Sequence, residues 1–136
     1  MRFHHIGVAV PDLSKALPSY AALFGYRLIS GPFDDPIQKV AVCFIGSGTP
    51  GEPTIELIAA NAPDSPIRSI LAQGGGAYHL CFETADIERA LEQAQEAGSL
   101  TVSRPVPAVA FGGRRIAWFY TPTRQLIELV EAAEAQ

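Results

Sequence analysis

The sequence lacks long hydrophobic runs and has only two cysteines. No apolar stretch approaches the ~18 residues of a membrane-spanning helix. The N-terminal Met-Arg-Phe-His-His is not followed by the ~7–15 apolar residues of a secretory signal. Cys43 and Cys81 lie in strand-like segments, where we expect reduced thiols and no disulfide. These features favour a cytoplasmic protein that has no membrane partner.

Blocks of like charge are also missing. Lys and Arg number 10 against 14 Asp and Glu, which gives a net charge of −4. This balance disfavours nucleic acid as a partner through bulk attraction. An anionic substrate would need local help from a cation, and the candidates are Lys39, Arg68, Arg114, Arg115 and Arg124. With 136 residues and 48% hydrophobic content, we expect one globular domain over residues 1–136.

An internal repeat is the most informative feature that is present. The segment from His5 to Leu17 aligns without a gap with the segment from His79 to Leu91. Further on, Ile55-Glu56-Leu57-Ile58 matches Ile127-Glu128-Leu129-Val130. The chain therefore reads as two copies of one module, about residues 1–60 and 77–131, joined by a linker over residues 61–76.

Hydrophobic periodicity and capping residues predict the same element order in both modules. In the first module we predict a strand at Phe3–Val10, a helix from Asp12 to about Phe24, and strands at Tyr26–Ser30, Gln38–Ile45 and Thr54–Ala60. In the second we predict a strand at Tyr78–Glu83, a helix from Asp86 to Ala97, and strands at Leu100–Ser103, Arg114–Tyr120 and Gln125–Glu131. We expect Arg104–Gly113 to be a loop, and Ser65–Leu71 to be a short helix with Pro66 at its first position.

The predicted fold class is α+β. Two β-α-β-β-β modules would form a curved, cup-shaped sheet of about eight strands, with the helices outside and a concave inner face. One module alone would leave one face of its sheet exposed, because it has too few residues to bury that face.

The repeat places two histidines and two glutamates at equivalent positions: His5, Glu56, His79 and Glu128. Each glutamate is flanked by branched apolar residues, and a buried carboxylate is costly without a partner. Taken singly, each of the four would also suit a surface or core position. As a symmetric set they predict a metal site. The adjacent His4 is expected on the opposite face of its strand and is left out of the set.

The chain resembles the vicinal oxygen chelate superfamily, which includes glyoxalase I, methylmalonyl-CoA epimerase, extradiol dioxygenases and bleomycin-resistance proteins. The resemblance rests on His5-Ile-Gly-Val-Ala-Val-Pro-Asp12, Glu56, Tyr78-His79-Leu and Glu128. It implies paired β-α-β-β-β modules and one divalent metal ion bound by His5, Glu56, His79 and Glu128. Mixed nitrogen and oxygen ligands suit Co, Ni, Mn, Fe or Zn.

Within the superfamily, two branches fit. Asp64-Ser-Pro-Ile67 and Gly-Gly-Ala-Tyr-His79 resemble methylmalonyl-CoA epimerases, whereas Gln38–Gly48 resembles glyoxalase I. Some epimerases carry a second catalytic glutamate on the third strand, near Ala41 in this chain, where none stands. The neighbouring Cys43, expected to face inward, is a poor base, and Lys39 is expected on the face of Ala41.

The expected function is therefore a metal-dependent epimerase or isomerase that removes a proton next to a thioester carbonyl, in a cytoplasmic homodimer. Glu128 is the expected main base and Glu56 the second, since epimerisation needs one group to take a proton and another to return one. The alternatives are a glyoxalase I-like lyase, an extradiol dioxygenase, and a non-catalytic bleomycin-resistance-type binding protein.

Overall fold

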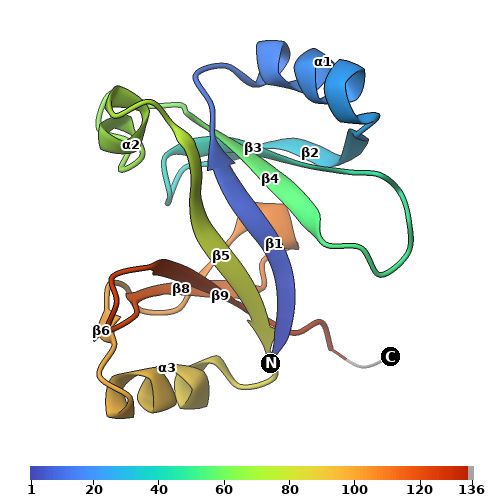
Figure 1. The fold of residues 1–136 in the computed structure, drawn as a ribbon. Coiled ribbons are helices and arrows are strands. Elements are labelled where there is room, and N and C mark those ends of the chain that lie inside the picture. The colour runs from blue at the N-terminus through green and yellow to red at the C-terminus, as the bar shows by residue number, and fades with distance from the viewer. Residues whose placement is uncertain (135–136) are drawn as a thin grey trace. The chain divides into compact units, whose positions relative to one another are not determined.

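The computed structural model describes residues 1–134 (Figure 1). The elements, in chain order, are β1 (Arg2–Ala9), α1 (Leu13–Phe24), β2 (Arg27–Asp35), β3 (Val40–Gly46), β4 (Thr54–Ala60), α2 (Arg68–Ala72), β5 (Gly76–Thr84), α3 (Ile87–Glu96), β6 (Leu100–Thr101), β7 (Val106–Pro107), a 3-10 turn (Val109–Phe111), β8 (Arg115–Tyr120) and β9 (Leu126–Glu131). The mixed α+β class and the two β-α-β-β-β modules are confirmed. None of the helices in residues 1–134 is long and apolar enough to cross a membrane.

The chain divides into two compact units. The first unit contains residues 5–78, and the second contains residues 1–4 and the chain from His79 onward. Strands of the first unit follow the order β2-β3-β4-β1, in which only β1 and β4 are parallel. Those of the second follow the order β5-β9-β8-β6, in which only β5 and β9 are parallel. The repeat in sequence is therefore a repeat in strand pairing.

The two long helices start and pack in the same way. The Asp12 carboxylate accepts a hydrogen bond from the backbone N–H of Ser14 at 2.9 Å, and that of Asp86 accepts one from Arg89 at 3.0 Å. These are the expected N-caps, which satisfy donors that the first helical turn leaves unpaired. Each helix covers one face of its own strands (Figure 1).

The core of each unit lies between its helix and its strands. In the first unit Leu13, Ala16, Leu17 and Tyr20 of α1 pack on Cys43, Ile45 and Leu57. In the second unit Ile87, Ala90 and Leu91 of α3 pack on Ala117, Ile127 and Leu129. Because side chains alternate along a strand, the residues next to these core positions point to the other face. Glu56 precedes Leu57 and Glu128 precedes Leu129, so both glutamates lie on the face that the helices do not cover.

Two strands differ clearly from the prediction. The segment expected to be a loop before β8 contains the short strand β7, which pairs with β8. Strand β2 continues to Asp35 because register shifts on either side of Ser30 let it stay paired with β3. Gly31 is required there, since its φ is 93° and a Cβ would approach the backbone oxygen of Val42 to 2.9 Å.

The short helix of the linker starts later than predicted. Its first residue is Arg68, and Pro66 precedes it. The Arg68 backbone N–H donates to the carbonyl of Ser65 at 3.1 Å, which closes a turn around Pro66 and Ile67. Ile67 is 4% exposed, so burial of its side chain holds this turn.

Candidate metal and proton-transfer site

The first histidine–glutamate pair is built by the parallel strands β1 and β4. His5 is in register with Thr54, and Gly7 is in register with Glu56. Because Gly7 has no side chain, the Glu56 carboxylate has room to approach His5 along the sheet face. The distance from His5 Nε2 to Glu56 Oε1 is 3.4 Å, and both residues are buried. The structure therefore brings together the two predicted site residues of the first unit.

The second pair repeats this geometry on β5 and β9. His79 is in register with Leu126, and the small Cys81 is in register with Glu128, as Gly7 is with Glu56. The distance from His79 Nε2 to Glu128 Oε1 is 3.5 Å, and both residues are buried. The two predicted site residues of the second unit are likewise adjacent.

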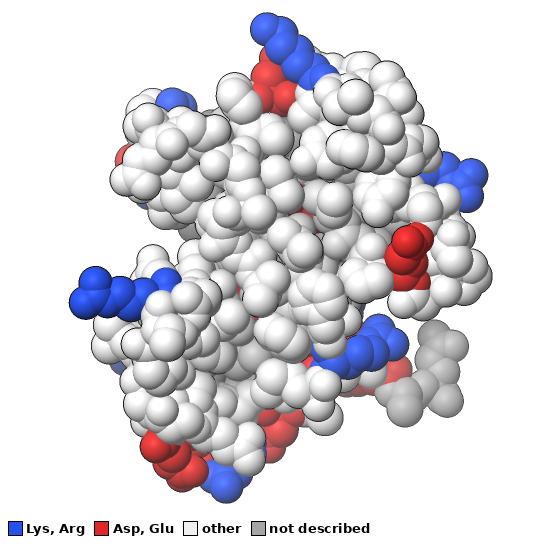
Figure 2. Space-filling view, viewed as in Figure 1, with Lys and Arg blue, Asp and Glu red and all other residues white. Residues whose placement is uncertain are grey.

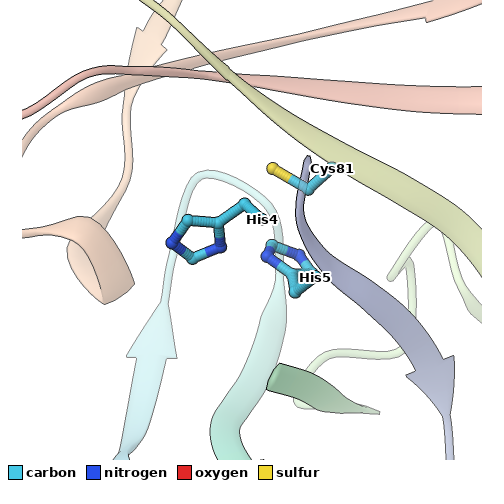
Figure 3. Close-up of side chains that lie close together, drawn as sticks. All are labelled: His4, His5 and Cys81. Carbon is cyan, nitrogen blue, oxygen red and sulfur yellow. The ribbon is translucent and has the colours of Figure 1, made fainter. Parts of the chain in front are cut away.

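The rings of His4 and of His5, its neighbour on β1, contact different aromatic residues. The His4 ring lies edge-on to Phe111, with 5.6 Å between the ring centroids. The His5 ring lies edge-on to Phe44 at 5.2 Å. Figure 3 shows the side chains of His4 and His5 together with that of Cys81, which lies on β5. Cys81 and Cys43 are both buried, and neither forms a disulfide.

An aromatic residue lies beside each His/Glu pair, and neither of these two aromatic residues was predicted from the sequence as part of the site. Phe44 on β3 is directly opposite Glu56, and Trp118 on β8 is directly opposite Glu128. The Trp118 ring lies edge-on to His79, with centroids 4.8 Å apart, as Phe44 does to His5. The signal in the sequence was an aromatic residue that follows a small one, Cys43 or Ala117, on the strand before the last strand of each module.

Strand β3 offers no base on the face of Glu56. Phe44 is opposite Glu56, so Val42, two residues earlier, shares its face. Cys43 was wrongly expected to face inward, because its side chain packs in the core beneath α1. Burial, with a smaller effect from the Glu56 carboxylate, raises the pKa of the Cys43 thiol to about 11. The thiol therefore stays protonated at neutral pH and cannot accept a proton.

A comparison with known protein families identifies the chain. The family model of the glyoxalase/bleomycin resistance protein/dioxygenase superfamily matches residues 4–118. The chain belongs to this superfamily. The match covers most of the first module and the second module as far as Trp118, so Glu128 and β9 lie beyond it.

The chain is also similar to individual members of the superfamily, among them epimerases and a lyase. The chain is 31% identical to the ethylmalonyl-CoA/methylmalonyl-CoA epimerase of Cereibacter sphaeroides, over 88% of this chain and 87% of that protein. A methylmalonyl-CoA epimerase from Streptomyces coelicolor, solved with 2-nitronate-propionyl-CoA, has a TM-score of 0.81 and 26% identity, over 98% of this chain and 99% of that one. A lactoylglutathione lyase of Arabidopsis thaliana is 27% identical over 96% of this chain, which spans 44% of that protein.

The residues present fit a divalent metal ion. Each pair offers an imidazole nitrogen and a carboxylate oxygen, the ligand types of Zn, Co, Ni, Mn and Fe. Two ligands each ~2.1 Å from one ion lie roughly 3.0–3.4 Å apart at octahedral or tetrahedral angles. The separations of 3.4 and 3.5 Å are close to this spacing and longer than a normal hydrogen bond. In each pair, the distance between the histidine nitrogen and the glutamate oxygen therefore suits two ligands of the same metal ion.

Most of the cations considered for an anionic substrate are engaged elsewhere. Lys39 forms an ion pair with Asp64, and Arg68 Nε donates to the carbonyl of Ala62 at 2.8 Å. Arg114 donates to Glu83 and to the carbonyl of Glu131, and Arg115 forms ion pairs with Glu88 and Glu131. These ion pairs with Arg115 lower the pKa of both Glu88 and Glu131. On the face in Figure 2, basic and acidic side chains occur in small groups.

Proposed function

We propose that this protein is a metal-dependent epimerase that removes and returns the α-proton of an acyl-CoA thioester. The observation that carries the proposal is the pair of equivalent, buried His/Glu arrangements in a member of this superfamily. The identity to an ethylmalonyl-CoA/methylmalonyl-CoA epimerase over most of both chains supports the choice of substrate class.

His5, Glu56, His79 and Glu128 together bind one divalent ion in this proposal. The equivalence of the two pairs under the sequence repeat supports a shared ion, because two pairs give four ligands and leave up to two octahedral positions for substrate oxygens. Bound there, the ion would supply Lewis-acid stabilisation of negative charge on the thioester oxygen.

Glu128 and Glu56 act as the proton-transfer groups. An epimerase must take the α-proton on one face of the carbon and return a proton on the other, which requires two groups. The carboxylates that are buried in residues 1–134 belong to Glu56, Glu128 and Asp35. Asp35 is occupied by the turn after β2, where it accepts from the N–H groups of Ile37 and Gln38. The two site glutamates are thus the remaining candidates, and Glu128 is proposed as the main base.

Deuterium exchange tests this function. Metal-replete protein incubated in D₂O with methylmalonyl-CoA is expected to place deuterium at the α-carbon, as measured by mass spectrometry. Propionyl-CoA, whose α-proton is less acidic, serves as the comparison substrate. If no deuterium enters methylmalonyl-CoA or other short 2-alkylmalonyl thioesters with Co, Ni, Mn, Fe or Zn present, the epimerase proposal is wrong.

A glyoxalase I-type lyase is the second candidate. It is favoured by the residues of β3 on the sheet face of Glu56. These include Val42 and Phe44, and none of them is a carboxylate. The similarity to a lactoylglutathione lyase agrees with it. This enzyme class also moves a proton next to a carbon bound to sulfur, so the same residues would serve. Turnover of the methylglyoxal–glutathione adduct, without exchange into methylmalonyl-CoA, would select it.

We further propose that the two units form one catalytic domain and that the protein is a cytoplasmic homodimer. Exposed apolar side chains at the end of α1 and on β2 support a contact between copies: Leu23, Phe24, Leu28 and Ile29. The two cysteines form no disulfide, which suits a reducing compartment. A monomeric mass in analytical ultracentrifugation would contradict the dimer.

A further inference from the structure

Trp118 presents a buried hydrogen-bond donor beside the second His/Glu pair. Strand pairing fixes Trp118 directly opposite Glu128, and its ring is edge-on to His79 with an interplanar angle of 86°. The indole Nε1 is buried, although the residue as a whole is partly exposed. No group in residues 1–134 accepts a hydrogen bond from it.

The other unit shows that this donor is not needed for packing. Phe44 has the equivalent place opposite Glu56, and its ring contacts His5 edge-on, with an interplanar angle of 74°. A phenyl ring therefore suffices to pack against the histidine of a pair. What Trp118 adds is a larger ring and one N–H group.

A buried N–H without an acceptor destabilises a protein, so such a group in a candidate site indicates a partner that binds there. The donor is next to Glu128, the proposed base. Arg115 at the start of the same strand and Arg114 before it form ion pairs with Glu83, Glu88 and Glu131, so their charges are engaged there.

We propose that the Trp118 indole N–H donates a hydrogen bond to an oxygen of the acyl group of the bound thioester. Trp118 is then a substrate-binding residue that holds the acyl group beside Glu128. The inference rests on the proposed function, since it assigns a role toward the same substrate class. It concerns recognition of the acyl group and leaves metal binding to the His/Glu pairs.

Trp118→Phe removes the donor and keeps a ring like that of Phe44. The expected result is a rise in the KM for methylmalonyl-CoA of about two- to tenfold, the range for one hydrogen bond to an uncharged acyl oxygen. The metal content and kcat should change little. Tyr120→Phe is the matched control, since it removes one donor from an exposed position of the same strand. An unchanged KM in Trp118→Phe, or an equal rise in Tyr120→Phe, would overturn the inference.

Fluorescence separates this inference from the proposed reaction. Trp118 is the only tryptophan of the chain, so emission excited at long wavelength reports on this side chain alone. Titration of the metal-replete protein with propionyl-CoA should change the emission, whereas CoA, which has no acyl group, should not. This result stands even if no α-proton exchanges, in which case the proposed function fails alone. The same response to both ligands, or none to propionyl-CoA, would contradict the role of Trp118.

Discussion

Glu128→Gln is expected to slow α-proton exchange by about 10²–10⁴-fold, the usual effect of losing a general base. The amide has nearly the shape of the carboxylate and can still coordinate a metal through its oxygen, but it cannot accept a proton at neutral pH. The protein should therefore keep its metal while turnover falls. Exchange rates by mass spectrometry and metal content by elemental analysis measure the two effects separately.

Glu131→Gln is the matched control for this variant. Glu131 is on the same strand, β9, but alternation puts it on the helix-covered face with Leu129. Its carboxylate bonds to Arg115, at 2.8 Å from the backbone nitrogen and from Nε. This variant should exchange protons at the normal rate. If Glu128→Gln also kept near-normal exchange, the base would lie elsewhere, and Glu56 would be the next group to replace.

Loss of either histidine of the two pairs is expected to remove the metal. If one ion is shared by both pairs, His5→Ala and His79→Ala should each weaken metal binding at least about 10–100-fold, the loss seen when even an outer partner of a ligand is changed. Exchange activity should fall with the metal in both variants. Elemental analysis should find about one ion per chain in the wild type and little in either variant.

The neighbouring histidine provides the control for this experiment. His4→Ala removes an imidazole next to His5 on β1, yet its ring packs against Phe111, outside the pairs. This variant should keep the metal of the wild type. Two ions per chain in the wild type, with one retained in each of the single variants, would show two independent sites and contradict a shared ion.

The repeat made the pairing of site residues predictable. Aligned segments fold into equivalent strands, so His5 and His79 had to occupy equivalent places, as did Glu56 and Glu128. The capping residues Asp12 and Asp86 similarly fixed where the two long helices begin. These features depend on local patterns and on the similarity of the modules.

Strand register could not be predicted in the same way. A shift of one residue turns every side chain of a strand to the other face. The sequence predicts that β3 is a strand. Only its pairing with β4 shows that Val42 lies on the same sheet face as Glu56, and Cys43 on the same face as Leu57. The partners of Lys39 and Arg115 were equally inaccessible, because Asp64 and Glu131 approach them from distant parts of the chain.

The places of Phe44 and Trp118 could be predicted only in part. Their equivalence follows from the repeat, but an aromatic residue in a strand usually indicates core packing and draws no attention as a site residue. Only the cross-strand positions opposite Glu56 and Glu128 connect them with the pairs. The buried indole nitrogen of Trp118 then depends on packing that no sequence pattern describes.

The central claim is that two equivalent His/Glu pairs bind one catalytic metal ion. A crystal structure of the zinc-replete protein, with the ion located by its anomalous scattering, tests it most directly. The expected result is a single ion bound by His5, Glu56, His79 and Glu128, with both histidine nitrogens ~2.0–2.1 Å away. An ion held by only one pair, or a separate ion at each pair, would contradict the account.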